Sequence, residues 1–267
     1  MTALANEARR GALAHQAAAE SRVDSVPPAA PVGGILFDVP DVLYDATLWR
    51  RWLFQLVGHL GIRLSYGEFH RAWDAHLVDV HRGRREYAEA LESFLLACGL
   101  SWAQVDEIEA ASRIARQNLE LAVRPLPGVA RAIDELAKLG PPLAAWADAP
   151  HTAAMLAERL GRLVPHTRFD AVLTSFDLEC TQPAAECYQA ALRALGLSAA
   201  QTVYVGHDTG HLAGARAAGM RTVAFNHEPD AEADHYLTRF DDLLALAKSW
   251  TILPRPSPGG TIEPTAR

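Results

Sequence analysis

The sequence predicts an α/β protein with a doubly wound, parallel, Rossmann-like sheet. From residue 125 onward, short apolar segments of strand type alternate with segments of helical periodicity, a pattern typical of βαβ units. A separate apolar run at 34–37 is followed by a long stretch of helical periodicity without any strand pattern. These observations predict an α/β core with an all-helical insert after its first strand.

The first expected strand, residues 34–37, is an apolar run that ends at Asp38. Pro40 follows and cannot continue a sheet ladder. Because ligands bind at the carboxyl ends of the strands in open parallel sheets, Asp38 is either a chemical group of a site or an acid that caps the turn. This stretch alone leaves both alternatives open.

Residues 46–123 are expected to form the helical insert. Apolar residues recur there at spacings of three and four, as on one face of a helix. Three such apolar faces come first, and a fourth helical segment follows over 105–121. The first face comprises Trp49, Trp52, Leu53, Leu56, Val57 and Leu60, the second Phe69, Trp73, Leu77 and Val80, and the third Leu91, Phe94, Leu95 and Cys98.

The α/β core is expected to comprise residues 34–45 and 124–250. Its later strands are predicted at 143–147, 171–174, 202–205 and 222–225, and its helices at 130–139, 151–160, 183–195 and 212–218. The Ala- and Pro-rich leader, residues 1–33, and the Pro- and Gly-rich tail, residues 251–267, have the composition of disordered segments.

Composition excludes several classes of protein. The chain has 267 residues, 49% of them apolar, and a net charge of -7, so we expect no nucleic-acid partner. No apolar run is long enough to span a bilayer. Three cysteines without CxxC spacing indicate a reducing, cytoplasmic setting, with Cys180 and Cys187 expected to behave as small buried hydrophobes.

Notable residues stand at the ends of four expected strands or in the loops after them. They are Asp38, the pair Ala147 and Asp148, Gln182 before Pro183, and the pair His207 and Asp208. Parallel topology brings such strand ends to one edge of the sheet. We therefore expect these residues to converge on one crevice.

Over residues 34–225 the chain resembles the haloacid dehalogenase-like (HAD-like) superfamily, chiefly its phosphatases with a helical cap. The resemblance rests on F-D-V-P-D-V-L-Y-D at 37–45, on F-D-A-V-L-T-S at 169–175 with Q-P-A-A-E-C-Y at 182–188, and on V-Y-V-G-H-D at 203–208 with A-G-A-R-A-A-G-M-R-T-V-A at 213–224. It implies a HAD-like fold, with residues 46–123 as the cap that selects the substrate.

The resemblance also implies roles for the residues at the strand ends. In this family the Asp after the first strand attacks phosphorus and forms an aspartyl-phosphate, which makes Asp38 the catalytic nucleophile. Mg²⁺ would be held by Asp38, the carbonyl of Pro40, and His207 or Asp208. The positions of Ala147, Asp148 and Gln182 would bind the substrate's phosphoryl group.

The motif set is degenerate, because most helper residues of the family are replaced. Pro40 stands where the family has its acid/base Asp, Ala147 where it has a Ser or Thr, and Gln182 where it has a Lys. His207 takes the place of the metal-binding Asp, with Asp208 one residue later. An arginine of the insert, Arg82, Arg84 or Arg85, is the alternative source of the missing positive charge.

These losses favour a weakly active or non-catalytic protein, a pseudoenzyme that binds a small molecule or regulates. A unit-charge contact at about 4 Å contributes about 4 kcal/mol at an effective dielectric of about 20, which is about a thousandfold in rate. Loss of general acid catalysis costs about 10²–10⁴-fold more. The alternative is an active Mg²⁺-dependent hydrolase of a small phosphorylated metabolite that works through an aspartyl-phosphate at Asp38.

A third reading concerns a different metal. His207 and His211 are four residues apart, a spacing that puts both on one helical face near Asp38 and Asp208. The alternative for these histidines is a solvated loop without metal. The solvated loop is favoured, because two histidines at this spacing are weak evidence for a metal by themselves.

Overall fold

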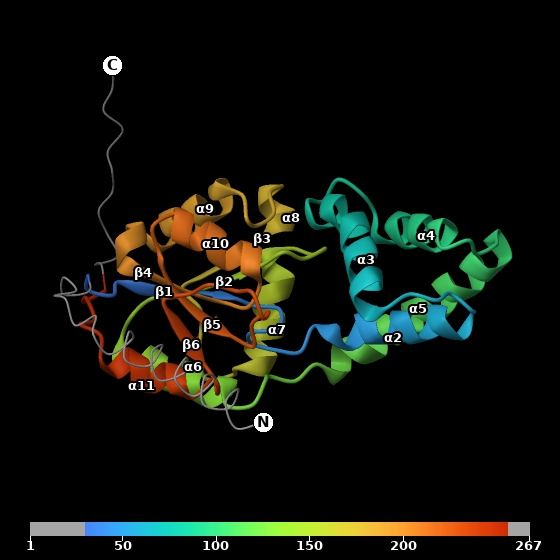
Figure 1. Cartoon of the computed structure of the whole chain (residues 1–267). Coiled ribbons are helices and arrows are strands. Elements are labelled where there is room, and N and C mark those ends of the chain that lie inside the picture. The colour runs from blue at the N-terminus through green and yellow to red at the C-terminus, as the bar shows by residue number, and fades with distance from the viewer. Residues whose placement is uncertain (1–29, 256–267) are drawn as a thin grey trace, which may run out of the picture. The chain divides into compact units, whose positions relative to one another are not determined.

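The computed structural model describes residues 30–255 and contains one sheet of six parallel strands in the order β3-β2-β1-β4-β5-β6 (Figure 1). The strands are β1 Gly34–Asp38, β2 Leu143–Ala147, β3 Ala171–Thr174, β4 Thr202–Gly206, β5 Arg221–Phe225 and β6 His235–Leu237. The predicted α/β fold with a doubly wound parallel sheet is therefore confirmed. Strand β6 was not predicted, because two of its three residues are exposed and give no apolar run.

Helices cover both faces of this sheet (Figure 1). Apolar residues of α6, α7 and α11 pack in one core layer with Ile35 and Phe37, whereas residues of α9 and α10 pack in a second layer with Leu36. Successive side chains of a strand point to opposite faces, so β1 contributes to both layers. The core helices are α6 Val129–Leu139, α7 Ala153–Leu163, α8 Ser175–Leu178, α9 Ala185–Leu195, α10 Thr209–Ala217 and α11 Asp242–Lys248, with a 3₁₀ turn at Ala199–Gln201.

Two core helices, α7 and α10, differ from their expected bounds by three residues at one end. Helix α7 continues through Gly161 to Leu163, although glycine often ends a helix. Helix α10 begins at Thr209, three residues earlier than expected, because Asp208 caps it: the Asp208 carboxylate accepts the main-chain N–H of His211 at 2.9 Å. A short polar side chain before a helix satisfies amides that lack a partner within the helix.

The ordered fold includes residues that were expected to belong to the leader and the tail. Val32 is fully buried and forms a parallel bridge with Ile252. Its N–H donates to the carbonyl of Thr251 at 2.8 Å, and its carbonyl accepts from Leu253 at 2.8 Å. These residues therefore belong to the ordered fold; the remainder of the expected leader, 1–29, and of the expected tail, 256–267, lies outside the described residues.

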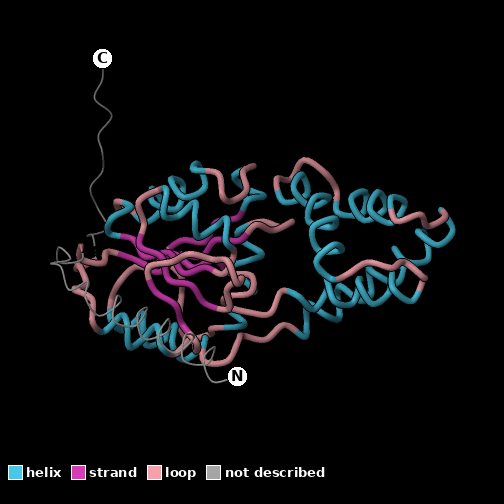
Figure 2. Tube along the Cα trace, in the orientation of Figure 1, coloured by secondary structure: helices cyan, strands magenta, loops and turns pink. Residues whose placement is uncertain are grey.

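Between β1 and β2 the described chain contains helices and loops (Figure 2). The helices are α2 Thr47–His59, α3 Tyr66–His81, α4 Tyr87–Ala97 and α5 Trp102–Ala122. They share an apolar core centred on Trp73, which is 0% exposed and packs edge-on against Phe94 with ring centroids 5.2 Å apart. Capping boxes at Ser65 and Ser101 fix the first turns of α3 and α5.

The helical insert contacts the loops at the carboxyl edge of the sheet. The Ser175 hydroxyl donates to the carbonyl of His81 at 2.8 Å, and Arg82 Nη2 donates to the Thr181 hydroxyl at 3.0 Å. Within residues 30–255 no helix is both long enough and apolar enough to cross a bilayer.

Gly206 provides a test of the packing at the end of β4. A Cβ at this position would lie 2.4 Å from Cε1 of the fully buried Tyr204 ring. We expect Gly206→Ala to lower the free energy of unfolding by about 1–3 kcal/mol, because the ring has no free space to enter. Urea unfolding of both proteins measures the change.

Gly58→Ala is the matched control. Gly58 lies within α2, and an added Cβ there meets nothing within 4 Å. Because alanine favours helix over glycine, this variant should gain about 0.5–1 kcal/mol. A Gly206→Ala protein as stable as the wild type would contradict the packing described for Tyr204.

Candidate active site

The carboxylate of Asp38, at the end of β1, lies at the centre of the candidate site and is 2% exposed. One oxygen, Oδ2, receives three contacts: His211 Nδ1 at 3.0 Å, the Tyr204 hydroxyl at 3.3 Å and His207 Nδ1 at 3.6 Å. The last contact is longer than a hydrogen bond, and His207 Nδ1 has no other partner. Two imidazoles and a phenol therefore surround the expected nucleophile.

Tyr204 and Gln182 extend this network. The Gln182 side-chain amide donates to the Tyr204 hydroxyl at 3.1 Å, and that hydroxyl donates in turn to Asp38. The main-chain N–H of Gln182 donates to Asp148 Oδ2 at 3.0 Å. Gln182 thus occupies the predicted place beside the site, with a neutral amide where the resemblance implies a lysine.

Asp148 closes the network on the side of β2. Its Oδ1 accepts the indole N–H of Trp146 at 3.0 Å, and its Oδ2 lies 3.8 Å from Nε2 of His211. Asp38, His211, Asp148, Gln182 and Tyr204 therefore form a closed ring of polar contacts, called the polar ring below.

Charge and burial shift the pKa values in this ring. Burial by itself raises the pKa of Asp38, but contacts with His207 and His211 outweigh it and hold that pKa far below its usual range. Burial lowers the pKa of His211, but Asp38 overrides this and raises it to about 9. Burial raises the pKa of Asp148 to about 6, against the opposing charge of His211. At neutral pH, Asp38 and His211 therefore form a charged pair.

Asp41, next to Pro40, is held apart from the polar ring. Its Oδ2 accepts from Arg50 Nη2 of α2 at 2.7 Å, and its Oδ1 accepts the N–H of Ala46 at 2.8 Å. Its φ of 58° lies in the left-handed region, where a non-glycine residue is uncommon. Asn226, also at positive φ, donates its side-chain amide to the Asp41 carbonyl at 2.8 Å.

Most of the sequence-predicted residues converge as expected. A cavity of about 600 Å³ at the carboxyl edge of the sheet, called the crevice below, is lined by Asp38, Pro40, Asp148, Gln182, His207 and Asp208 among others. Ala147 differs: it is 0% exposed, packs in the apolar core and lines neither this cavity nor the neighbouring one. Its methyl group therefore offers nothing to a substrate.

Comparison with known proteins identifies the family of this fold and site. The model of the haloacid dehalogenase-like hydrolases matches residues 32–219. The chain belongs to the haloacid dehalogenase-like hydrolase family. It is also 26% identical over 231 residues to glyceraldehyde 3-phosphate phosphatase of Methanocaldococcus jannaschii. This match covers 82% of this chain and 98% of that protein.

Solved structures of other members show the same fold. A putative β-phosphoglucomutase of Thermotoga maritima superposes with a TM-score of 0.59 at 17% identity, covering 81% of this chain and 99% of that one. A 2-haloacid dehalogenase of Pseudomonas syringae gives a TM-score of 0.53 at 22% identity, covering 81% and 99%. The recognition of a HAD-like, phosphatase-type member is therefore confirmed.

The arginines of the insert do not take the place of the family's lysine. Arg82 donates to Thr181, the neighbour of Gln182. Arg84 lies 3.7 Å from the Glu179 carboxylate, and Arg85 donates to the carbonyl of Glu89. The charged group beside Asp38 is instead the imidazolium of His211.

The side chains at this edge do not fit Mg²⁺ in the conformation described. Mg²⁺ prefers six oxygen ligands in octahedral geometry, whereas the buried oxygen of Asp38 faces nitrogens and a phenol. One carboxylate oxygen of Asp208 already accepts the main-chain N–H of His211 at the start of α10. Among residues 30–255, no group of three or more His, Cys, Asp or Glu has the arrangement of a metal site, so the alternative of a transition metal at His207 and His211 gains no support either.

The crevice is acidic. Its arginines, Arg50 and Arg51, each have a carboxylate partner, Asp41 at 2.7 Å and Asp45 at 3.9 Å. Its four histidines include His211, which is paired with Asp38. Seven carboxylates line the crevice: Asp38, Asp41, Asp45, Asp74, Asp148, Asp208 and Glu228. This balance opposes the binding of a free phosphate dianion.

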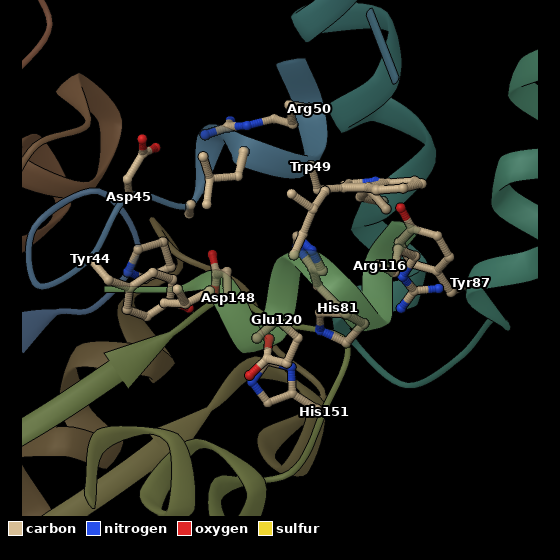
Figure 3. Close-up of a pocket in the computed structure, with 18 of the residues that line it drawn as sticks. Tyr44, Asp45, Trp49, Arg50, His81, Tyr87, Arg116, Glu120, Asp148 and His151 are labelled. Atoms are coloured by element: carbon tan, nitrogen blue, oxygen red, sulfur yellow. The ribbon is translucent and has the colours of Figure 1, made fainter. Parts of the chain in front are cut away.

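A second cavity of about 300 Å³ adjoins the crevice under the insert and is called the aromatic cavity (Figure 3). Trp49, Trp73 and Tyr87 contribute to its walls, and Arg116 lies over the Tyr87 ring at 3.7 Å from its centroid. Buried polar atoms without a hydrogen-bond partner gather here; they are the indole nitrogens of Trp49 and Trp73, the Tyr87 hydroxyl and Nε2 of His151. Such groups are rare in native structures, so these atoms are available to a water or to a ligand.

Several residues of the site could not be found from the sequence. Tyr204 lies within an apolar strand, where an aromatic residue usually signals packing. Arg50 follows Trp49 on a helix of ordinary polarity, and no pattern in the sequence pairs it with Asp41. The signal for His211 was its spacing from His207, which suggested a shared metal in place of a pair with Asp38.

The Asp38–His211 pair predicts a pH dependence of stability. His211 has a raised pKa in the folded protein, about 9 against 6.5 unfolded, so its contribution is complete below pH 6.5 and is lost as the pH rises towards 9. The free energy of unfolding should fall by about 1 kcal/mol per pH unit in this window, near the limit for one proton. Urea unfolding between pH 6 and 9.5 measures it.

His211→Asn should remove most of this slope, since asparagine does not titrate. The exposed His59→Asn serves as the control and should retain it. If the wild type shows no slope between pH 6.5 and 9, or if His211→Asn keeps it, the charged pair is refuted.

Proposed function

We propose that this HAD-like hydrolase family member binds a small molecule in the crevice and aromatic cavity, and that its phosphoryl-transfer chemistry is lost or strongly slowed. The observation that supports this is the engagement of Asp38 Oδ2 by His211, Tyr204 and His207. Hydrogen bonds to the charged form of a carboxylate stabilise it, and they therefore weaken it as a nucleophile. Here the buried oxygen of the expected nucleophile already accepts from its own neighbours.

The surroundings of Asp38 reinforce the proposal. Phosphoryl transfer depends on positive charge at the equatorial oxygens, whereas Gln182 is neutral and the crevice contains seven carboxylates. Pro40 has no proton to give to a leaving group. Location in a reducing, cytoplasmic compartment remains part of this proposal, in keeping with three free cysteines.

An active hydrolase of a small phosphorylated compound is the second candidate. His211 favours it, because an imidazolium with a pKa of about 9 places a positive charge 3.0 Å from Asp38. That charge would stand in for the absent lysine. The Methanocaldococcus relative is named for glyceraldehyde 3-phosphate, which makes this compound the first substrate to test.

A panel of phosphomonoesters, glyceraldehyde 3-phosphate included, separates the two candidates. We expect phosphate release by the wild type, with and without Mg²⁺, to equal that of Asp38→Asn, because Oδ2 of Asp38 is held by its neighbours and Gln182 and Pro40 supply neither a positive charge nor a proton. A colorimetric phosphate assay over hours measures both proteins. Turnover that is lost in Asp38→Asn would establish the hydrolase and end the non-catalytic proposal.

The aromatic cavity indicates the kind of ligand. Its aromatic walls suit a flat apolar body, and burial keeps His81 and His151 neutral by lowering the pKa of each to about 4. Arg50 and Arg159 are paired with Asp41 and Glu120. Arg116 has no carboxylate partner within 4.0 Å among the described residues. We therefore propose an aromatic or similarly flat carboxylate, with its anionic end towards Arg116.

Benzoate is a suitable probe for this cavity. We expect it to bind in ligand-observed NMR titrations, and Arg116→Gln to weaken binding about fivefold, the size of a half-exposed ion pair of about 1 kcal/mol. Arg113→Gln, on the same helix but outside the cavity lining, is the control and should bind like the wild type. Equal affinity in both variants would refute the role of Arg116.

A further inference from the structure

Two of the three cysteines lie in direct contact. The thiol of Cys187 donates to the sulfur of Cys180, with the Sγ atoms 3.0 Å apart. Cys187 is buried in the first turn of α9, and Cys180 is half-buried in the loop between α8 and α9. Cys98, at the end of α4, has no sulfur neighbour among the described residues. The pair thus offers more than the small buried hydrophobes that the sequence suggested.

We propose that Cys180 and Cys187 form a reversible redox site, in which hydrogen peroxide joins the two thiols in an intrachain disulfide. The cysteines are seven residues apart, and a bonded pair of sulfurs lies at about 2 Å. Closure therefore needs an approach of about 1 Å between a loop residue and the start of a helix. This inference is independent of the proposed function.

The difference in exposure of the two thiols sets the order of reaction. Cys180 is the more accessible sulfur, half-buried where Cys187 is buried, and it accepts the hydrogen bond from Cys187. Burial raises the pKa of the Cys187 thiol, and the neighbouring Cys180 raises it further. Cys180 is therefore the sulfur that meets the oxidant, and Cys187 is the one that resolves the product.

The electrons and atoms balance with peroxide as the oxidant. The Cys180 thiolate attacks one peroxide oxygen, the O–O bond breaks, and the departing hydroxide takes up the thiol proton as water, leaving a sulfenic acid. The sulfur of Cys187 then attacks the Cys180 sulfur. The S–O bond breaks, the hydroxide takes the Cys187 proton, and a second water leaves. Two thiols lose two electrons, and one peroxide gains them.

The bond would form beside the polar ring. Cys180 and the Gln182 member of the polar ring lie in the same loop. In this loop the Thr181 hydroxyl accepts from Arg82 of the insert. The main-chain N–H of Gln182 donates to Asp148, and its side-chain amide N–H donates to the Tyr204 hydroxyl. A disulfide would tie this loop to α9 through Cys187. Oxidation would therefore restrict the segment that connects the insert, the polar ring and Asp38.

Peptide mapping of the full chain tests the proposal. The protein is treated with hydrogen peroxide, free thiols are alkylated, and a glutamyl endopeptidase cuts after Glu179 and Glu186, which directly precede the two cysteines. We expect a disulfide-linked peptide pair that dithiothreitol separates, with Cys98 alkylated throughout. Peptides in which Cys180 and Cys187 are both alkylated, or both overoxidised without a link, would overturn it.

Single variants supply the controls. Cys98→Ser should form the same link as the wild type. Cys187→Ser should retain a sulfenic acid at Cys180 that dimedone traps, because the resolving thiol is absent. A linked pair that contains Cys98, or a disulfide between two chains on a non-reducing gel, would overturn the assignment as well. The wild-type map decides the question even where a variant fails to fold.

Discussion

The contact between Asp38 and His211 is the constraint on which the rest of the site depends. Asp38 is 2% exposed at the end of a central strand, and an uncompensated buried charge costs several kcal/mol. His211 compensates this charge at 3.0 Å. It lies in the first turn of α10, the helix that follows β4, and β4 is a neighbour of β1 in the sheet. The same contact makes the buried acid tolerable and, because it stabilises the charged form, weakens that oxygen as a nucleophile.

The polar ring extends this constraint across the sheet edge. Tyr204 joins Asp38 to Gln182, and Gln182 joins the loop before α9 to Asp148. Its members come from β1, β4, the end of β2, the loop and α10, so every contact spans separate elements. The absence of a side chain at Gly206 permits this arrangement, because the Tyr204 ring occupies the space that a side chain there would need.

The sequence was sufficient for the architecture and for the place of the site, but not for the partners of its residues. Alternating apolar runs are local patterns, and they predicted β1 to β5 and the longer helices between them, but not the one-turn helix α8. The convergence of Asp38, Asp148, Gln182 and His207 followed from parallel topology. The pairing of Asp38 with His211, the Tyr204 bridge and the capture of Arg50 by Asp41 depend on side-chain directions in three dimensions. No periodicity encodes these.

Ala147 shows that a position predicted from the sequence can lack a side chain that reaches the cavity. Its position at the end of β2 matched a family substrate-binding residue, yet its side chain packs in the core at 0% exposure. A position defines a backbone location, whereas a function needs a group that reaches the cavity. The strand ends therefore fix where the crevice lies, and the side chains that reach it determine its chemistry.

The two cavities differ in kind. Carboxylates dominate the lining of the crevice at the sheet edge, which opposes the binding of a free phosphate or another anion. Beneath the insert, Trp49, Trp73 and Tyr87 line a cavity beside polar atoms that have no hydrogen-bond partner among the described residues, and Arg116 has no carboxylate partner within 4.0 Å among the same residues. Under the proposed function, a flat anionic ligand therefore gains more from the aromatic cavity than from the surroundings of Asp38. The place between sheet and insert follows from the fold, whereas the proposed determinants of the ligand lie on the insert.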